Sequence, residues 1–187
     1  MAGASEKIVP EINSLLFRAY RRLPWLLVAL FGEILSGNVI KNYSETLQAV
    51  VALSFFIPLL MDMSGNVGTQ SAAIVVRGLA TGQIEPLMIW KNVLRESCVG
   101  AILGLINGAL VAAIAYLWHG VPALGLAIGL AMVLNLTIAA FLGTFIPLFW
   151  NRLGRDPAVT SGPFVTTLLD IIGLLVYFAT ARLLLKF

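Results

Sequence analysis

The sequence predicts an all-α integral membrane protein. Of its 187 residues, 59% are hydrophobic and only 11% are charged, a balance that soluble domains of this length do not reach. Five apolar stretches have the roughly 20 residues that a helix needs to cross about 30 Å of hydrocarbon. Seventeen glycines favour close packing between transmembrane helices. Together these observations predict a bundle of five transmembrane helices.

A short amphipathic helix is expected before the first span, at residues 6–22. Apolar residues recur there at three- and four-residue spacing, and the end of the segment is basic. We expect this helix to lie along the cytoplasmic membrane surface or to dock under the bundle. The predicted division is therefore an N-terminal tail with an amphipathic helix at 1–22, followed by a five-helix transmembrane domain at 23–187.

The five predicted spans cover about residues 23–40, 47–80, 93–118, 121–149 and 164–185. The second span is anomalous, because it is too long for one straight crossing and holds the polar stretch MDMSGNVGTQSAA at 61–73. The simplest solution is one long helix that is kinked or loosened at Ser64 and Gly65. The backbone groups freed by such a kink must face protein or water rather than lipid.

The distribution of Lys and Arg predicts the orientation. With a cytoplasmic N-terminus and five crossings, nine of the twelve basic residues fall in cytoplasmic segments. This matches the excess of basic residues on the cytoplasmic side of membrane proteins. We therefore expect a multi-pass protein of the cell (inner) membrane, with its N-terminus in the cytoplasm and its C-terminus outside.

Composition argues against several classes of site. The single cysteine, Cys98, cannot form an internal disulfide, and no pair of Cys or His residues offers a zinc site. The lone histidine, His119, lies between a tryptophan and a glycine at a segment end, which is typical of an interfacial turn. The net charge of +3 is too small and too scattered to predict binding to nucleic acid.

Carboxyl groups inside the spans are the main functional candidates, because a carboxylate in hydrocarbon is costly unless it meets water, a cation or a partner. Asp170 lies about seven residues into the fifth span, and no basic residue falls within a turn or two of it. This favours a functional role over that of a protonated structural acid. Asp62 can serve a function or cap the following half of its helix. Glu33, midway along the first span, can line a pathway or pair with a basic residue of another helix.

Other polar residues in the spans are amides and hydroxyls. Asn66, Thr69 and Gln70 cluster beside an acid and two glycines, which favours a polar cavity over simple hydrogen bonds between helices. Asn107 and Asn135 stand alone in the third and fourth spans. We interpret each of these two as a hydrogen-bonding residue between helices rather than as a ligand.

Glycines at four-residue spacing mark one small face on the third span and one on the fourth. They are Gly100, Gly104 and Gly108 on the third span, and Gly125 and Gly129 on the fourth. Faces of this kind let helices approach closely. The contact can lie within one protomer or at the seam of a dimer.

Two long motifs, in this order, resemble the transmembrane domain of MgtE-type magnesium channels. They are MSGNVGTQSAAIVVRGLATGQI at 63–84 and NRLGRDPAVTSGPFVTTLLDIIGLLVYF at 151–178. The resemblance covers the chain from about Arg22 onward. It implies a channel that passes hydrated Mg²⁺ through a pore at a homodimer interface, lined by the second and fifth transmembrane helices.

The resemblance also implies the site residues. Asp170 matches an aspartate in the middle of the family's fifth helix that binds hydrated Mg²⁺, and Asp156, in GRDPA, matches a loop aspartate at the cytoplasmic end of the pore. Gly162 and Thr166 precede Asp170 on the same helix face, within two turns, where backbone or hydroxyl oxygens can support the water shell of the ion. The residues expected to line the pore from the second helix are Asp62, Asn66, Gly68, Thr69 and Gln70.

The chemistry of Mg²⁺ agrees with this interpretation. The ion sheds its waters reluctantly, so a site for the hydrated ion needs a few widely spaced carboxylates and carbonyls rather than a tight cage of acids. One Asp170 per chain, doubled by two-fold symmetry, provides two negative charges against the two positive charges of the ion.

The sequence departs from the family pattern in two ways. Family members commonly carry a large acidic cytosolic region with CBS modules that sense Mg²⁺ and close the pore, whereas some twenty residues precede the first predicted span here. We therefore expect a shortened or stand-alone channel, without closure by such modules. Ser64 stands where the family usually has glycine, which still leaves close backbone approach possible.

Three other functions are open to a chain with these residues. A proton-coupled carrier for Mg²⁺ or another divalent metal such as Co²⁺ can use Asp170 to carry a proton. An intramembrane aspartyl protease needs two membrane aspartates, but Asp62 and Asp170 lack the Y-D and G-x-G-D signatures of that class. A purely structural subunit does not explain an uncompensated Asp170. The sequence therefore favours a transport protein over an enzyme.

Overall fold

Every regular element that the structure describes is a helix. The structure is a computed structural model, and it describes residues 15–85, 88–157 and 162–185. The helices in these ranges are α2 (Leu15–Asn42), α3 (Ser44–Ala49), α4 (Ala52–Ala80), α5 (Ile89–His119), α6 (Pro122–Arg152) and α7 (Pro163–Leu185). The predicted all-α class is confirmed.

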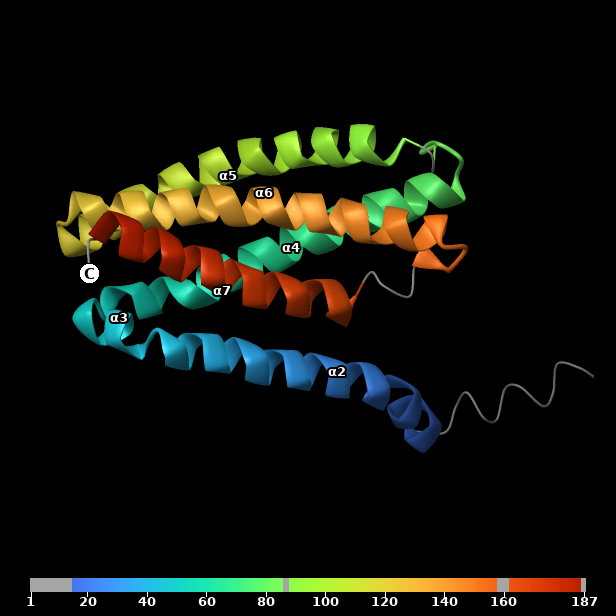
Figure 1. Ribbon diagram of the computed structural model, residues 1–187, viewed down its shortest axis with the longest axis horizontal. Coiled ribbons are helices and arrows are strands. Elements are labelled where there is room, and N and C mark those ends of the chain that lie inside the picture. The colour runs from blue at the N-terminus through green and yellow to red at the C-terminus, as the bar shows by residue number, and fades with distance from the viewer. Residues whose placement is uncertain (1–14, 86–87, 158–161, 186–187) are drawn as a thin grey trace, which may run out of the picture.

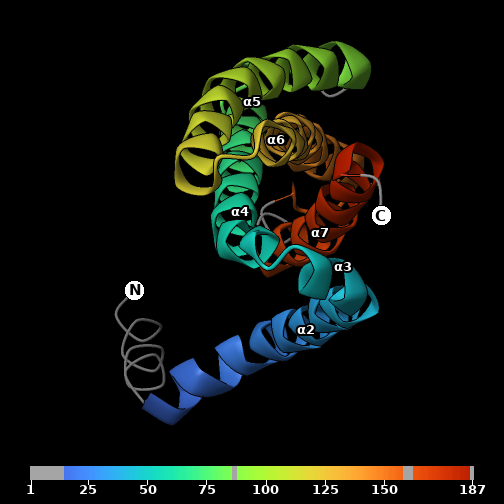
Figure 2. The same ribbon diagram turned by 90° about the vertical axis from the view of Figure 1, so that its left-hand side faces the viewer.

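Helix α6 is the centre of the bundle. It packs against α5, α4 and α7, which surround it in the end-on view of Figure 2. Helix α2 lies outside this group and makes its main contact with α7 (Figure 1). The consequence is that α7 is held between the central helix and α2, so its polar residues can face cavities on both sides.

Four of the described helices are long and apolar enough to cross a membrane, namely α2, α5, α6 and residues 164–185 of α7. This establishes a multi-pass architecture. Helix α4 does not reach the same hydropathy, because the polar stretch at 61–71 lies in its middle. Its length of 29 residues still equals about 44 Å of helix, more than a bilayer core requires. The fifth crossing therefore stays a prediction.

The predicted kink at Ser64 and Gly65 is not confirmed. Helix α4 continues without interruption from Ala52 to Ala80, and the Ser64 hydroxyl donates to the Met61 carbonyl at 3.0 Å within the same helix. The residue in α4 that cannot donate a helical hydrogen bond is Pro58. The start of the second element also differs from the prediction, since residues 44–49 form the separate helix α3.

The predicted amphipathic segment is only partly described. Residues 6–14 lie outside the described residues, and residues 15–22 form the first turns of α2 itself. The helix runs through Arg22 and Pro24 without a break, so the described residues show no boundary between a surface helix and the first span. The division at residue 22 stays a prediction.

The two glycine faces meet each other within the chain, between α5 and α6. A Cβ atom at Gly108 would lie 2.6 Å from the Gly129 carbonyl oxygen, and one at Gly125 would lie 2.6 Å from that of Ala112. The turn between the helices is tight, because Gly120 adopts φ +68° and Pro122 starts α6. Of the two possibilities left by the sequence, the structure therefore shows the contact within one protomer.

The two isolated asparagines behave differently. Asn135 of α6 donates its side-chain amide to the Gly173 carbonyl of α7 at 3.3 Å, which confirms a hydrogen bond between helices. Asn107 instead donates to the Leu103 carbonyl of its own helix at 2.8 Å. The interpretation of Asn107 as a link between helices was therefore wrong, because an amide four residues after a carbonyl can satisfy itself locally.

The C-terminal half of α7 is tied to α3 and α4. The Tyr177 hydroxyl donates to the Leu53 carbonyl at 2.8 Å, and the Tyr177 side chain is fully buried. Arg182 donates from Nε to the Thr46 hydroxyl at 3.1 Å and lies 4.7 Å from the centre of the Tyr43 ring. These contacts fix the height of α7 relative to α4, and with it the position of Asp170.

We expect Tyr177→Phe to destabilise the fold. The change keeps the ring but removes one buried hydrogen bond to the Leu53 carbonyl, which costs about 0.5–1.5 kcal/mol in the free energy of unfolding. Thermal unfolding in mild detergent should show a midpoint a few degrees lower than that of the native chain. Tyr116→Phe is the matched control, because Tyr116 is half exposed in α5, and an equal shift in both variants would contradict the prediction.

Candidate cation-binding site

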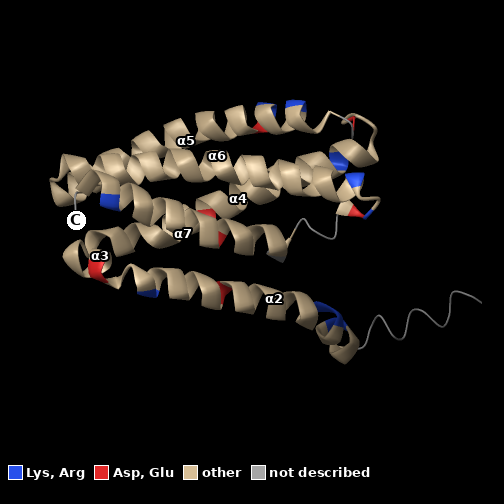
Figure 3. Ribbon diagram, in the orientation of Figure 1, with Lys and Arg blue, Asp and Glu red and all other residues tan. Residues whose placement is uncertain are grey.

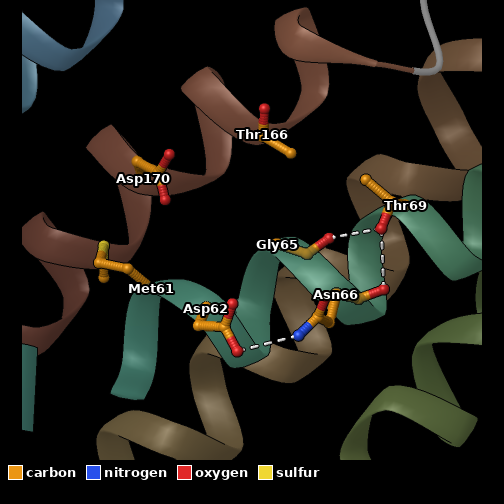
Figure 4. A pocket seen from close by; sticks show the side chains of 7 residues that line it. All are labelled: Met61, Asp62, Gly65, Asn66, Thr69, Thr166 and Asp170. Atoms are coloured by element: carbon orange, nitrogen blue, oxygen red, sulfur yellow. Dashed lines mark hydrogen bonds between the residues drawn. The ribbon is translucent and has the colours of Figure 1, made fainter. Parts of the chain in front are cut away.

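A polar cavity lies between the middle stretches of α4 and α7. Its volume is about 380 Å³. Side chains three or four positions apart share one helix face, so residues at this spacing on each helix can line one cavity. The lining residues are Met61, Asp62, Gly65, Asn66 and Thr69 from α4, and Thr166 and Asp170 from α7 (Figure 4).

The side chains on the α4 wall are ordered by hydrogen bonds within the helix. The Asn66 amide donates to Asp62 Oδ2 at 3.0 Å, and the Thr69 hydroxyl donates to the Gly65 carbonyl at 2.8 Å (Figure 4). A hydroxyl that donates to the backbone keeps its lone pairs as acceptors. Together with the carboxylates of Asp62 and Asp170, the wall therefore offers acceptor oxygens, which suit the water molecules of a hydrated cation because those waters donate outward.

Among the described residues, the lining of this cavity includes two acidic residues and no basic residue. Acidic residues occur in the middle stretches of α2, α4 and α7, while the basic residues of the described helices gather toward helix ends (Figure 3). Within the described residues there is no group of three or more His, Cys, Asp or Glu side chains that could hold a metal ion tightly. The geometry thus suits a hydrated cation rather than a stripped one.

Close packing behind the cavity involves Gly68. A Cβ at this position would collide with the Leu169 side chain of α7, and one at Gly143 would collide with the Gly68 carbonyl oxygen. Gly68 is therefore buried between α4, α6 and α7 and is not among the residues that line the cavity. Gln70, also predicted to line the pore, is exposed on α4 and lies outside the lining as well.

The remaining predicted site residues lie toward the start of α7. Gly162 precedes the helix, and its carbonyl accepts the backbone N–H groups of Val165 at 3.0 Å and Thr166 at 3.4 Å. Asp156 is exposed after the end of α6. Thus Asp170 and Thr166 share the cavity with the α4 residues, whereas Gly162 and Asp156 do not line it.

A second cavity, of about 300 Å³, lies on another side of Asp170. It is lined by residues of three helices, namely Glu33, Ser36, Gly37, Ile40, Ile57, Met61, Asp170 and Leu174. The side chains of Glu33 and Asp170 line this cavity together and interact electrostatically with each other. Of the two possibilities for Glu33, a place in the lining of a cavity and a pair with a basic residue, the structure shows the first, with the acidic Asp170 in the same lining.

Sequence reasoning missed Met61 and Ser36 as lining residues. Met61 lines both cavities, but a methionine in an apolar helix carries no signal for this. Ser36 follows Glu33 by three positions, so the two share a helix face, and that spacing was the signal that could have found it.

Comparisons with known proteins identify relatives of this chain. The family model MgtE, described as a divalent cation transporter, matches residues 57–180. The chain is 41% identical over 179 residues to the "Magnesium transporter MgtE" of Bacillus subtilis. The aligned region covers 96% of this chain and 40% of that protein.

Two further relatives carry the same name. The protein of Thermus thermophilus is 39% identical over 166 residues, covering 88% of this chain and 36% of that protein. The protein of Enterococcus faecalis is 36% identical over 188 residues, covering 100% of this chain and 41% of that protein.

The chain therefore spans about two fifths of the length of these curated relatives. The region matched by the family model includes both walls of the first cavity. The family is described as a transporter rather than an enzyme, so the protease alternative finds no support. The chain belongs to the MgtE family of divalent cation transporters.

Proposed function

We propose that this protein is a channel for hydrated Mg²⁺, with a pore formed where two copies meet and lined by α4 and α7. The observation that carries the proposal is the cavity between these helices, whose acceptor oxygens include two carboxylates far from any helix end. Helix α4 is then the second of five crossings, and its polar face is covered by α7 and by the second copy rather than by lipid. The N-terminus lies in the cytoplasm and the C-terminus outside.

The binding of Mg²⁺ rests on Asp170 and Thr166, supported by Asp62, Asn66 and Thr69 across the cavity. A hydrated ion fits such a site because it needs acceptors at the distance of its water shell rather than direct ligands. Gly162 and Asp156 act closer to the cytoplasmic mouth of the pore, and Gly68 and Gln70 support the α4 wall.

Mg²⁺ uptake tests this function directly. The purified chain, reconstituted in liposomes that contain a Mg²⁺-sensitive dye, should give uptake that Co²⁺ and Ca²⁺ compete for to different extents. Recordings in planar bilayers separate a channel from a proton-coupled carrier, since a channel gives discrete unitary currents at a fixed pH. Uptake that requires a proton gradient, without unitary currents, would favour the carrier.

We expect the active species to be a dimer. One chain offers few helices to enclose a path for a divalent ion, whereas two copies about a two-fold axis bring two Asp170 residues to one pore. Native mass spectrometry in mild detergent should show a mass of two chains, and brief chemical cross-linking in membranes should give the same pair. A monomer that sustains full Mg²⁺ uptake would contradict this expectation.

A further inference from the structure

The second cavity has the composition of an ion site in its own right. It lies between α2, α4 and α7, and its polar lining consists of the Glu33 and Asp170 carboxyl groups and the Ser36 hydroxyl. Apart from these three residues the lining contributed by the described part of the chain is aliphatic, thioether or glycine, with no Lys or Arg. All three polar groups come from one chain, unlike the pair of Asp170 residues expected at the dimer axis.

The two carboxyl groups line the same cavity and interact electrostatically with each other. Two negative charges this close, in a segment surrounded by apolar side chains, repel strongly because the local dielectric constant is low. A cation between them removes the repulsion, and two carboxylates match the charge of one divalent ion. Acidic residues near this pair on the packed helices are limited, within the described residues, to Asp62 in the adjoining cavity.

Ser36 supplies an independent observation. Its side chain is 4% exposed, and its hydroxyl oxygen is buried without a hydrogen-bond partner among the described residues. A buried polar group without a partner is costly, so such a hydroxyl in the wall of a cavity indicates a ligand or water there. Ser36 and Glu33 are three positions apart on α2, so their oxygens share the face that meets α7.

Helix packing holds this face in place. Gly32, one turn before Ser36, is buried, and a Cβ atom there would collide with the Thr167 side chain of α7. The close approach of α2 to α7 therefore occurs at the level of Glu33 and Asp170. This packing fixes the spacing between the two helices that carry the two carboxyl groups.

We propose that Glu33, Ser36 and Asp170 form a second position for a divalent cation, in the cavity between α2 and α7 of a single chain. Carboxylate and hydroxyl oxygens are hard ligands, which suit Mg²⁺ or Mn²⁺ rather than a soft metal. At about 30 Å³ per water molecule, the cavity has room for an ion that keeps most of its waters. This inference deepens the proposed function, because Asp170 borders both cavities and an ion can pass between them without leaving its carboxylate.

Mn²⁺ binding tests the site, because the electron paramagnetic resonance signal of free Mn²⁺ counts the bound ions. The experiment titrates Mn²⁺ into the purified full chain in detergent and compares the native chain with Glu33→Gln, Glu33→Asp and Ser36→Ala. Glu33→Gln keeps the size and the hydrogen-bonding capacity but removes one of two charges, so we expect about a tenfold or greater rise in Kd. Glu33→Asp keeps the charge and should recover part of the affinity.

Ser36→Ala should raise Kd by a few-fold while leaving the thermal unfolding midpoint unchanged or higher, since the hydroxyl has no partner in the described residues. Glu96→Gln is the matched control, because Glu96 is an acid of α5 that lines neither cavity. An unchanged Kd in Glu33→Gln or in Ser36→Ala, with the same number of bound ions as the native chain, would overturn the second position.

The failure of this inference is distinguishable from failure of the proposed function. If liposomes that contain the native chain take up Mg²⁺ and Glu33→Gln binds Mn²⁺ like the native chain, the second position is absent and the transport function stands. If liposomes that contain the native chain take up no Mg²⁺, the proposed function fails. A loss of Mn²⁺ affinity that is confined to Glu33→Gln and Ser36→Ala would still support a cation site.

Discussion

Asp170→Asn is expected to remove most of the divalent-cation flux while the protein still folds and assembles. Asparagine keeps the size and the hydrogen-bonding capacity of the side chain but removes one negative charge per chain, from a residue that borders both cavities. An interaction with a charged group is worth about 1.5–3 kcal/mol, so the loss of flux should be about tenfold or more. Uptake of Mg²⁺ into liposomes is the measurement, with Co²⁺ and Ca²⁺ as competitors.

Asp170→Glu separates charge from geometry. This variant keeps the negative charge but moves the oxygens outward by one methylene group, which disturbs an ion whose waters are held in fixed places. We expect residual flux with weaker discrimination between Mg²⁺ and Ca²⁺. Wild-type transport by Asp170→Asn would show that the residue is a protonated structural acid, because an amide can replace a neutral carboxylic acid in a hydrogen bond.

Gly143→Ala is expected to cause a large loss of stability in the bundle. A Cβ atom at this position would collide with the carbonyl oxygen, carbonyl carbon and Cα of Gly68, so α6 and α4 would have to separate. No flexible side chain can move away to relieve the collision, since all three atoms belong to the backbone. Overpacking of this kind costs about 1–3 kcal/mol or more in the free energy of unfolding.

Gly37→Ala is the matched control for that change. Gly37 lies in the helical part of α2, and a Cβ atom there would meet nothing within 4 Å. Alanine is favoured over glycine in a helix, so this variant should be as stable as the native chain or slightly more stable. Unfolding midpoints measured in one detergent compare the two, and equal midpoints for Gly143→Ala and the native chain would refute the expected collision.

The contact between Gly143 and Gly68 helps to explain why α4 carries so many small and polar residues. Its glycines serve two different purposes on two faces. Gly65 lines the first cavity, where a Cβ would make only ordinary contact at 3.9 Å, while Gly68 allows close contact with α6 and α7. The polar stretch therefore combines a cavity-lining face at Gly65 with a close helix contact at Gly68, three residues later in the sequence.

The sequence alone determined the helical membrane class and the family motifs, and it singled out Asp170 as the main candidate for a functional residue. These conclusions rest on local properties, namely the length and hydropathy of each stretch and an acid without a nearby base, and local properties can be read along one chain. The existence of α3 and the continuity of α4 through Ser64 could not be read in the same way. They depend on packing, since Arg182 and Tyr177 of α7 hold residues of α3 and α4.

Only the tertiary structure decided which polar residues meet. Glu33 and Asp170 belong to the first and last described long helices, and hydropathy says nothing of which helices become neighbours or of how each is rotated about its axis. The glycine faces of α5 and α6 were visible in the sequence as a pattern, but a pattern of small residues fits any close partner. The packing of α5 against α6 decided between an internal contact and a contact between two copies. The identity of a charged residue is local, whereas its partner is set by long-range contacts that bring distant segments together.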